Sequence, residues 1–277
     1  MALLMGIMVA IGGSVGGSSG ATVMLVIALI FNFMSYYNCD KMVLSMYGAN
    51  VIERSDAPNL FDLVAKLAQK ANLPMPRVAI INSQVPNAFA TGRNPHHAVV
   101  AVTTGILETL SYEELSGVLA HELGHVKHRD ILISSLAAMM ATIISYIANI
   151  AQWAAIFGRS SDDDEGGGTL GFLFTVIVAP IAAMLIQLAI SRAREYDADE
   201  EGGKICGNPN FLADGLEKIE AVAHHVTLPN AKPSTAHLFI VNPLSGAGQT
   251  LMSLFSTHPA TEKRIARLRA QAQLMHL

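Results

Sequence analysis

Two long stretches without a charged side chain constrain this chain more than any other feature. Residues 131–157 and 166–191 contain no Asp, Glu, Lys or Arg. At about 1.5 Å per residue, either stretch is long enough as a helix to cross a hydrocarbon core of about 30 Å. The alternative is a buried core helix of a soluble domain, but uncharged runs above about 20 residues favour a membrane span.

The composition agrees with a membrane protein. Charged residues make up 14% of the 277 residues, against about 25% in soluble domains, and the mean hydropathy is +0.39. Two further apolar segments, residues 2–15 and 21–37, bring the predicted spans to four, although the first is short and followed by a glycine-rich stretch. No Lys or Arg precedes Lys41, so the charged region of a secretory signal is missing and we expect a retained anchor.

The net charge and the cysteine content argue against a nucleic-acid-binding protein and against a disulfide-rich protein. The net charge of −4 provides no basic stripe, so we expect no nucleic-acid binding. The two cysteines, Cys39 and Cys206, are far apart in sequence, which implies no disulfide framework and is compatible with a reducing compartment.

The segments between and after the spans have the composition of a folded α+β domain. A helix is predicted from Pro58 to about residue 71, and strands over residues 77–82, 88–91 and 98–103. We therefore expect an α+β, mainly helical chain with a four-span membrane anchor and a small sheet. Its predicted parts are two membrane helices (1–38), a folded part outside the membrane (39–130), a membrane hairpin (131–190) and a second folded part (191–277).

The segment His121-Glu122-Leu123-Gly124-His125 has the pattern H-E-x-x-H. On a helix, imidazoles at i and i+4 lie on one face, so both can bind one zinc ion at about 2.0 to 2.1 Å. Glu122 lies beside them and can take a proton from a water whose pKa zinc lowers to about 7. That combination is the chemistry of peptide hydrolysis. A surface helix that carries these residues by chance is the alternative.

The surrounding sequence favours a helix over residues 112–129. Ser111 and Glu114 have the spacing of a capping box. Gly117 and Gly124 each weaken a helix by about 1 kcal/mol relative to Ala, which indicates close packing at those positions. His128, one turn beyond His125, is a weaker candidate for a third ligand, because its spacing matches none of the usual zinc motifs that contain H-E-x-x-H.

The third ligand must lie in the same compartment as the zinc helix, so the two long spans are expected to form a hairpin. Lys127 and Arg129 flank its entry and Arg192 and Arg194 its exit, which places both ends on the cytoplasmic side. The polar helix that follows carries five acids, and a solvated acidic face is an equally simple interpretation of them. Spacing alone leaves the choice open among Glu195, Asp197, Asp199, Glu200 and Glu201.

The zinc motif, the hairpin, the segment 191–199 (SRAREYDAD) and the later Thr257-His258-Pro259 together resemble the HtpX membrane metalloproteases, distant relatives of the CAAX prenyl proteases. The resemblance implies a gluzincin-like fold with one Zn²⁺ per chain, bound by His121, His125 and Glu195. It further implies that Asp199 supports a ligating histidine, that His258 donates a hydrogen bond to the oxyanion, and that Arg264, nearby in sequence, contacts the substrate. Substrate would pair with the edge strand formed by Asn87, Ala88, Phe89, Ala90 and Thr91.

These features predict a zinc endopeptidase in the cell inner membrane, with its active site on the cytoplasmic side. Its expected partners are the lipid bilayer and protein or peptide substrates, including membrane proteins; a role in quality control and the stress response comes from the resemblance alone. A non-catalytic zinc-binding scaffold and a prenyl-protein protease are the alternatives. Intact Glu122 with three evident ligands favours catalysis over a closed structural site.

Overall fold

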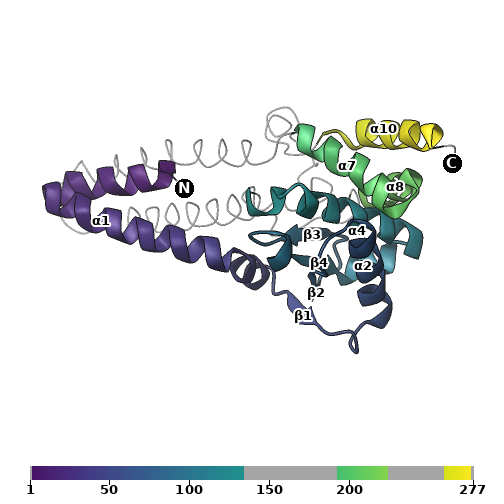
Figure 1. Cartoon of the computed structure of the whole chain (residues 1–277), viewed down its shortest axis with the longest axis horizontal. Coiled ribbons are helices and arrows are strands. Elements are labelled where there is room, and N and C mark those ends of the chain that lie inside the picture. Colours follow the sequence, from purple (N-terminus) through teal and green to yellow (C-terminus); the bar gives the residue numbers. More distant parts are fainter. Residues whose placement is uncertain (1, 134–191, 224–258, 276–277) are drawn as a thin grey trace, which may run out of the picture.

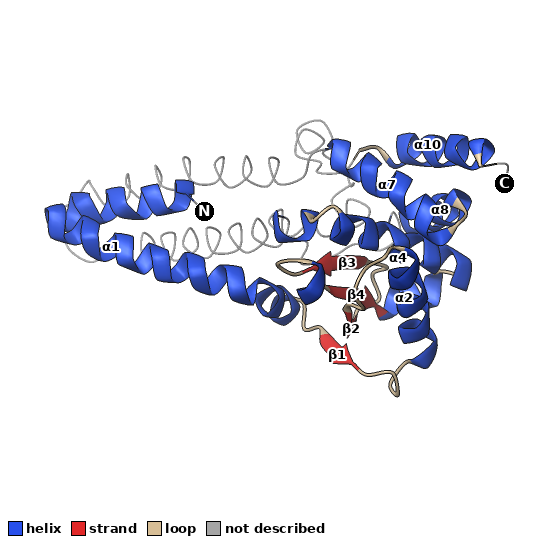
Figure 2. Cartoon of the chain, in the orientation of Figure 1, coloured by secondary structure: helices blue, strands red, loops and turns tan. Residues whose placement is uncertain are grey.

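The computed structural model describes residues 2–133, 192–223 and 259–275. These residues are mainly helical and include one four-stranded mixed sheet (Figures 1 and 2). The predicted class, mainly helical with a small sheet, is confirmed. Most of the predicted hairpin and His258 lie outside the described residues.

Helix α1 (Ala2–Met46) contains both predicted N-terminal apolar segments and bends between them at Gly16 and Gly17. Gly17 has φ +60°, a conformation that glycine adopts without steric penalty. Figure 1 shows two helical arms that fold back on one another, with the second arm leading into the domain that holds the sheet. The part Gly16–Met46 is 31 residues long and apolar, so it qualifies as a membrane span by length and composition.

The second arm of α1 continues beyond residue 37, where the apolar segment was expected to end. Its last turns serve as a packing element of the domain, because Cys39, Val43 and Leu44 are buried. Farther up the same arm, apolar side chains such as Ile30 and Phe33 are exposed, as expected of a helix that contacts lipid. The same helix thus exposes apolar side chains in its middle part and buries apolar side chains against the domain at its C-terminal end.

The sheet has the strand order β1-β2-β4-β3. Strands β2 (Arg77–Ile81) and β4 (Val99–Thr103) pair in parallel, and the outer strands β1 (Asn50–Ile52) and β3 (Ala88–Thr91) pair antiparallel with them. All five residues of β4 are buried, as its continuous apolar run requires of a central strand. Among the described residues, β3 pairs with β4 alone and is an edge strand.

Each face of the sheet has its own cover. On one face, Val78, Val100 and Val102 join the main core, which includes Leu63 and Leu67 of α2 (Pro58–Lys70). On the other face, the end of α1 packs on the sheet through a smaller cluster, which consists of Val43, Leu44, Ala79, Ile81, Phe89, Val99 and Ala101. The position of the edge strand β3 is therefore fixed from both faces.

Helix α4 (Tyr112–Lys127) carries the H-E-x-x-H motif and lies between the sheet and the C-terminal helices. The predicted capping box is confirmed: Ser111 N donates to Glu114 Oε2 at 2.8 Å, and Glu114 N donates to Ser111 Oγ at 3.3 Å. The remaining described helices are η1 (Pro95–His97), α3 (Thr104–Thr109), α7 (Arg192–Cys206), α8 (Pro209–Ala223) and α10 (Thr261–Leu274).

Glycines allow α7 and α8 to approach α4 closely. A Cβ at Gly202 would lie 2.9 Å from His121 Cα, and one at Gly124 would lie 3.1 Å from the carbonyl oxygen of Ala198. A Cβ at Gly117 would lie 2.3 Å from Leu212 N. The close packing predicted at Gly117 and Gly124 is confirmed, and it brings α7 against the face of α4 that carries the motif.

Candidate metal centre and active site

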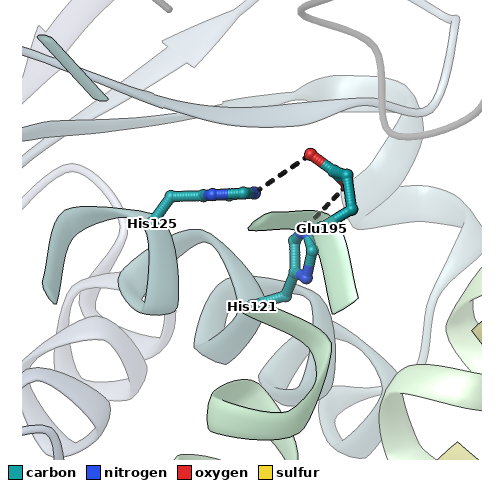
Figure 3. A group of neighbouring side chains, drawn as sticks. All are labelled: His121, His125 and Glu195. Atoms are coloured by element: carbon teal, nitrogen blue, oxygen red, sulfur yellow. Dashed lines mark ion pairs between the residues drawn. The ribbon is translucent and has the colours of Figure 1, made fainter. Parts of the chain in front are cut away.

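The structure brings His121 and His125 of α4 together with Glu195 of α7. One potential ligand atom from each residue lies within 4.8 Å of the other two. The Nε2 atoms of His125 and His121 lie 3.4 Å and 3.7 Å from the two Glu195 carboxylate oxygens, as the dashed lines in Figure 3 show. Two imidazoles and a carboxylate are a donor set that zinc accepts, with a fourth position left for water or substrate.

Of the five acids that the sequence left open, Glu195 is the one that the docking of α7 on α4 places beside both histidines. Asp197 and Glu200 are exposed, and Glu201 forms an ion pair with Lys127 at 2.6 Å. His128, the weaker ligand candidate, is also exposed and is not in the group. In the described part of the chain, His121, His125 and Glu195 form the one group of this kind that could hold a metal ion.

Each histidine of the pair has a carboxylate at its second ring nitrogen. Asp199 Oδ1 lies 2.9 Å from His121 Nδ1, and Asp130 Oδ2 lies 3.3 Å from His125 Nδ1. Sequence reasoning included Asp199 through the resemblance but missed Asp130. The only available signal was an acid five residues after His125, at the border of the uncharged run.

Arg264 of α10 lies behind this group and is 1% exposed. Its guanidinium donates two hydrogen bonds to the Asp199 carboxylate, at 2.9 and 2.7 Å, and its Nη1 lies 3.8 Å from Glu195 Oε2. This placement favours a role in supporting the ligands over the substrate contact that the resemblance implied.

The buried charges shift the pKa values of the site. Burial raises the pKa of Glu122 although the two histidines lower it, so this carboxyl group is more basic than an exposed glutamate. Burial disfavours the charged form of His125, but the carboxylates of Asp130 and Glu195 outweigh it and raise the pKa to about 10. Burial also raises the pKa of Asp199, but Arg264 and His121 outweigh it and lower the pKa to about 2. The negative charges of Asp130, Glu195 and Asp199 therefore favour the binding of a cation between the two imidazoles.

The edge strand β3 passes directly over Glu122, the candidate base. Ala90 N donates a hydrogen bond to Glu122 Oε2 at 2.9 Å, so this N–H points away from β4 and toward α4. The neighbouring residue Asn87 exchanges hydrogen bonds with Thr103 at the start of the β3–β4 pairing. All four residues of β3 are buried, so neighbouring elements cover the strand and it does not lie on an open surface.

Two imidazoles, a converging carboxylate and a buried base beneath an edge strand are what a metal-dependent peptidase requires, and comparison with known proteins agrees. Residues 54–272 match the family described as peptidase family M48, and the chain belongs to that family. It is a membrane-associated metalloprotease, a hydrolase of peptide bonds. The resemblance to the HtpX membrane metalloproteases, inferred from the sequence motifs, is confirmed.

The similarity to known proteins extends over almost the whole chain. A protease HtpX homolog of Syntrophobacter fumaroxidans is 55% identical over 98% of this chain and 96% of that protein. One of Pyrococcus furiosus is 51% identical over 99% of this chain and 94% of that protein. The crystal structure of S. mikatae Ste24p has a TM-score of 0.54 and 16% identity, with 97% of this chain and 63% of that one covered, and it shows similarity of fold.

Proposed function

We propose that this metalloprotease is a zinc endopeptidase of the inner membrane that cleaves membrane or misfolded proteins on the cytoplasmic side, in quality control. The observation that carries the proposal is the convergence of His121, His125 and Glu195 within 4.8 Å, next to the buried Glu122. These three residues would hold one zinc ion per chain. Zinc, when bound there, supplies a Lewis acid that polarises the scissile carbonyl group and acidifies water.

The chain's own groups would perform the proton transfers. Glu122 accepts a proton from the attacking water and returns it to the nitrogen of the leaving amine, a task that its raised pKa favours. Asp199 orients His121 through the Nδ1 contact. We assign His258, on the resemblance, to donating a hydrogen bond to the oxyanion.

The proposal is tested on purified full-length protein by metal analysis and by cleavage of an unfolded substrate such as casein. We expect about one zinc per chain, loss of cleavage after treatment with a strong chelator, and recovery when zinc is added back. Cleavage that persists in metal-free protein would contradict the proposal. Bound zinc without cleavage would favour the non-catalytic scaffold instead.

We also propose the four-span arrangement, with helices in residues 1–38 and a hairpin in residues 131–190, and catalytic parts in 39–130 and 191–277. The candidate span Gly16–Met46 and the basic residues on both sides of the hairpin support it.

The arrangement predicts different accessibility of two engineered cysteines in a chain whose Cys39 and Cys206 are replaced by alanine. A cysteine in place of Ser161, between the two uncharged runs, should react with an impermeant thiol reagent from outside intact cells. One in place of the exposed Gln84 should react only after the membrane is opened. Labelling of both from the same side would rule out a spanning hairpin.

We further propose that substrate binds as an added strand along Asn87, Ala88, Phe89, Ala90 and Thr91. An edge strand offers main-chain hydrogen bonds to an extended peptide without demanding particular side chains, which suits broad specificity. The edge position of β3 and the contact between Ala90 N and Glu122 Oε2 support this proposal, because a peptide at that edge would reach the base.

Proline at Ala88 or Ala90 should weaken cleavage, because it removes an N–H from the outward edge of the strand. The loss of one hydrogen bond corresponds to about 1 kcal/mol, or a roughly fivefold fall in kcat/KM. Ala90→Pro also removes the contact with Glu122 and should lower cleavage further, whereas Ala88→Pro leaves that contact in place. Zinc content should stay unchanged in both variants. A collapse of the melting temperature would show that these N–H groups are internal to the fold.

A further inference from the structure

We propose that Asp130 is a positioning residue of the metal centre, which holds His125 as Asp199 holds His121. The inference rests on the proposed zinc function and adds a residue that neither the motif nor the similar proteins' names indicate. Both imidazoles would then present Nε2 to the metal, with a carboxylate at each Nδ1.

The contacts of the His125 ring define its orientation. Nε2 lies 3.4 Å from Glu195 Oε1, and Nδ1 on the opposite side of the ring lies 3.3 Å from Asp130 Oδ2. Asp130 is 7% exposed, so water competes little for this contact. An imidazole whose Nδ1–H donates to a carboxylate keeps its Nε2 lone pair for the metal and becomes a stronger ligand.

The backbone is bent at the point where this contact requires it. In a continuous helix, residues five apart point about 140° away from each other, so Asp130 could not face His125. Helix α4 instead ends at Lys127, Arg129 takes φ +63°, and helical conformation resumes at Asp130. A positive φ is unfavourable for a residue other than glycine and persists only where the surrounding structure imposes it. The bend turns the Asp130 carboxylate back toward His125.

The other oxygen of the same carboxylate faces α7. Arg194 Nε lies 3.7 Å from Asp130 Oδ1, and the residue after Arg194 is the ligand Glu195. Asp130 therefore contacts a ligand on α4 and the neighbour of a ligand on α7. Since Asp130 directly precedes one uncharged run and Arg194 closely follows the other, this pair joins the metal centre to both ends of the proposed membrane hairpin.

A purely structural role would be the favourable placement of an acid at the start of a helix, which the helix dipole stabilises. Two substitutions separate the roles. Asp130→Ser keeps a residue that is favourable at a helix start but is too short to reach His125. Asp130→Asn keeps an oxygen that can accept the Nδ1–H but removes the charge. Glu201→Ala is the matched control, because it removes the ion pair with Lys127, another contact between α4 and α7, and touches no ligand.

The experiment measures zinc affinity of the full chain in detergent by competition with a chelator, the visible spectrum after Co²⁺ substitution, and the melting temperature of the metal-free protein. We expect Asp130→Ser to weaken zinc affinity about 10- to 100-fold and to change the Co²⁺ spectrum. Asp130→Asn should recover part of the affinity, and Glu201→Ala should bind zinc as the wild type does. The metal-free Asp130→Ser and Glu201→Ala proteins should melt at similar temperatures.

Unchanged zinc affinity in Asp130→Ser, or an equal loss in Glu201→Ala, would overturn the inference while leaving the zinc protease intact. A wild-type chain that binds no zinc would remove the proposed function and this inference together. The zinc measurement on the wild-type chain therefore distinguishes failure of the inference from failure of the proposed function.

Discussion

We expect Glu122→Gln to abolish cleavage and to leave zinc bound. Glutamine has nearly the same shape but cannot take up a proton from the attacking water, and loss of a general base typically lowers the rate by a factor of about 10² to 10⁴. His121, His125 and Glu195 remain in place, so the ligand set is unchanged. The effect is measured as kcat on casein or a fluorogenic peptide, alongside zinc analysis of the same preparation.

A second glutamate of α4 provides the matched control. Glu114 is also buried, but it closes the capping box with Ser111 and pairs with Lys218 at 2.7 Å, away from the metal centre. Glu114→Gln makes the same chemical change and can keep the capping hydrogen bond, so it should retain activity. Wild-type cleavage by Glu122→Gln would contradict the assigned mechanism.

Glu195→Ala should have the largest effect on metal content, because it removes one of only three proposed protein ligands. Zinc should be lost from this variant during purification. Asp199→Ala keeps the ligands and should weaken zinc binding or activity by about 10- to 100-fold. It should also lower thermal stability, because it leaves the buried Arg264 without its bidentate partner, and breaking such a pair costs about 3 to 5 kcal/mol.

Two exposed acids on the same helix are the controls for this series. Asp197→Ala and Glu200→Ala should keep wild-type zinc content, since neither side chain is in the group of potential ligands. If either variant lost its zinc while Glu195→Ala kept it, the proposed ligand set would be wrong. Zinc analysis of the four variants in parallel, with melting temperatures, decides the point.

Local signals made parts of this fold predictable. The capping box of Ser111 and Glu114 identified the zinc helix, and short apolar runs separated by segments with Gly and Pro located β2, β3 and β4. Strand β1 was missed because it has only three residues and no periodic pattern. The apolar run of residues 21–37 predicted a membrane span, but it does not indicate that the helix continues to Met46 or that Val43 and Leu44 pack on the sheet.

The candidate site could be predicted only where its residues are close in sequence. His121, Glu122 and His125 lie on one helical turn, so their spacing sufficed. The choice of Glu195 depends on how closely α7 docks on α4 at Gly124 and Gly202, and sequence spacing does not contain that information; the resemblance supplied it. Asp130 was missed because its contact with His125 depends on the positive φ of Arg129. An arginine in the sequence does not predict a positive φ.

X-ray absorption at the zinc edge of the purified full-length protein identifies the atoms bound to the metal. With His121, His125 and Glu195 as ligands, we expect only nitrogen and oxygen neighbours at about 2.0 to 2.2 Å, with two imidazole scattering patterns that persist in Glu122→Gln. A sulfur neighbour at about 2.3 Å, or a single imidazole, would contradict the assignment of His121, His125 and Glu195 as the ligands.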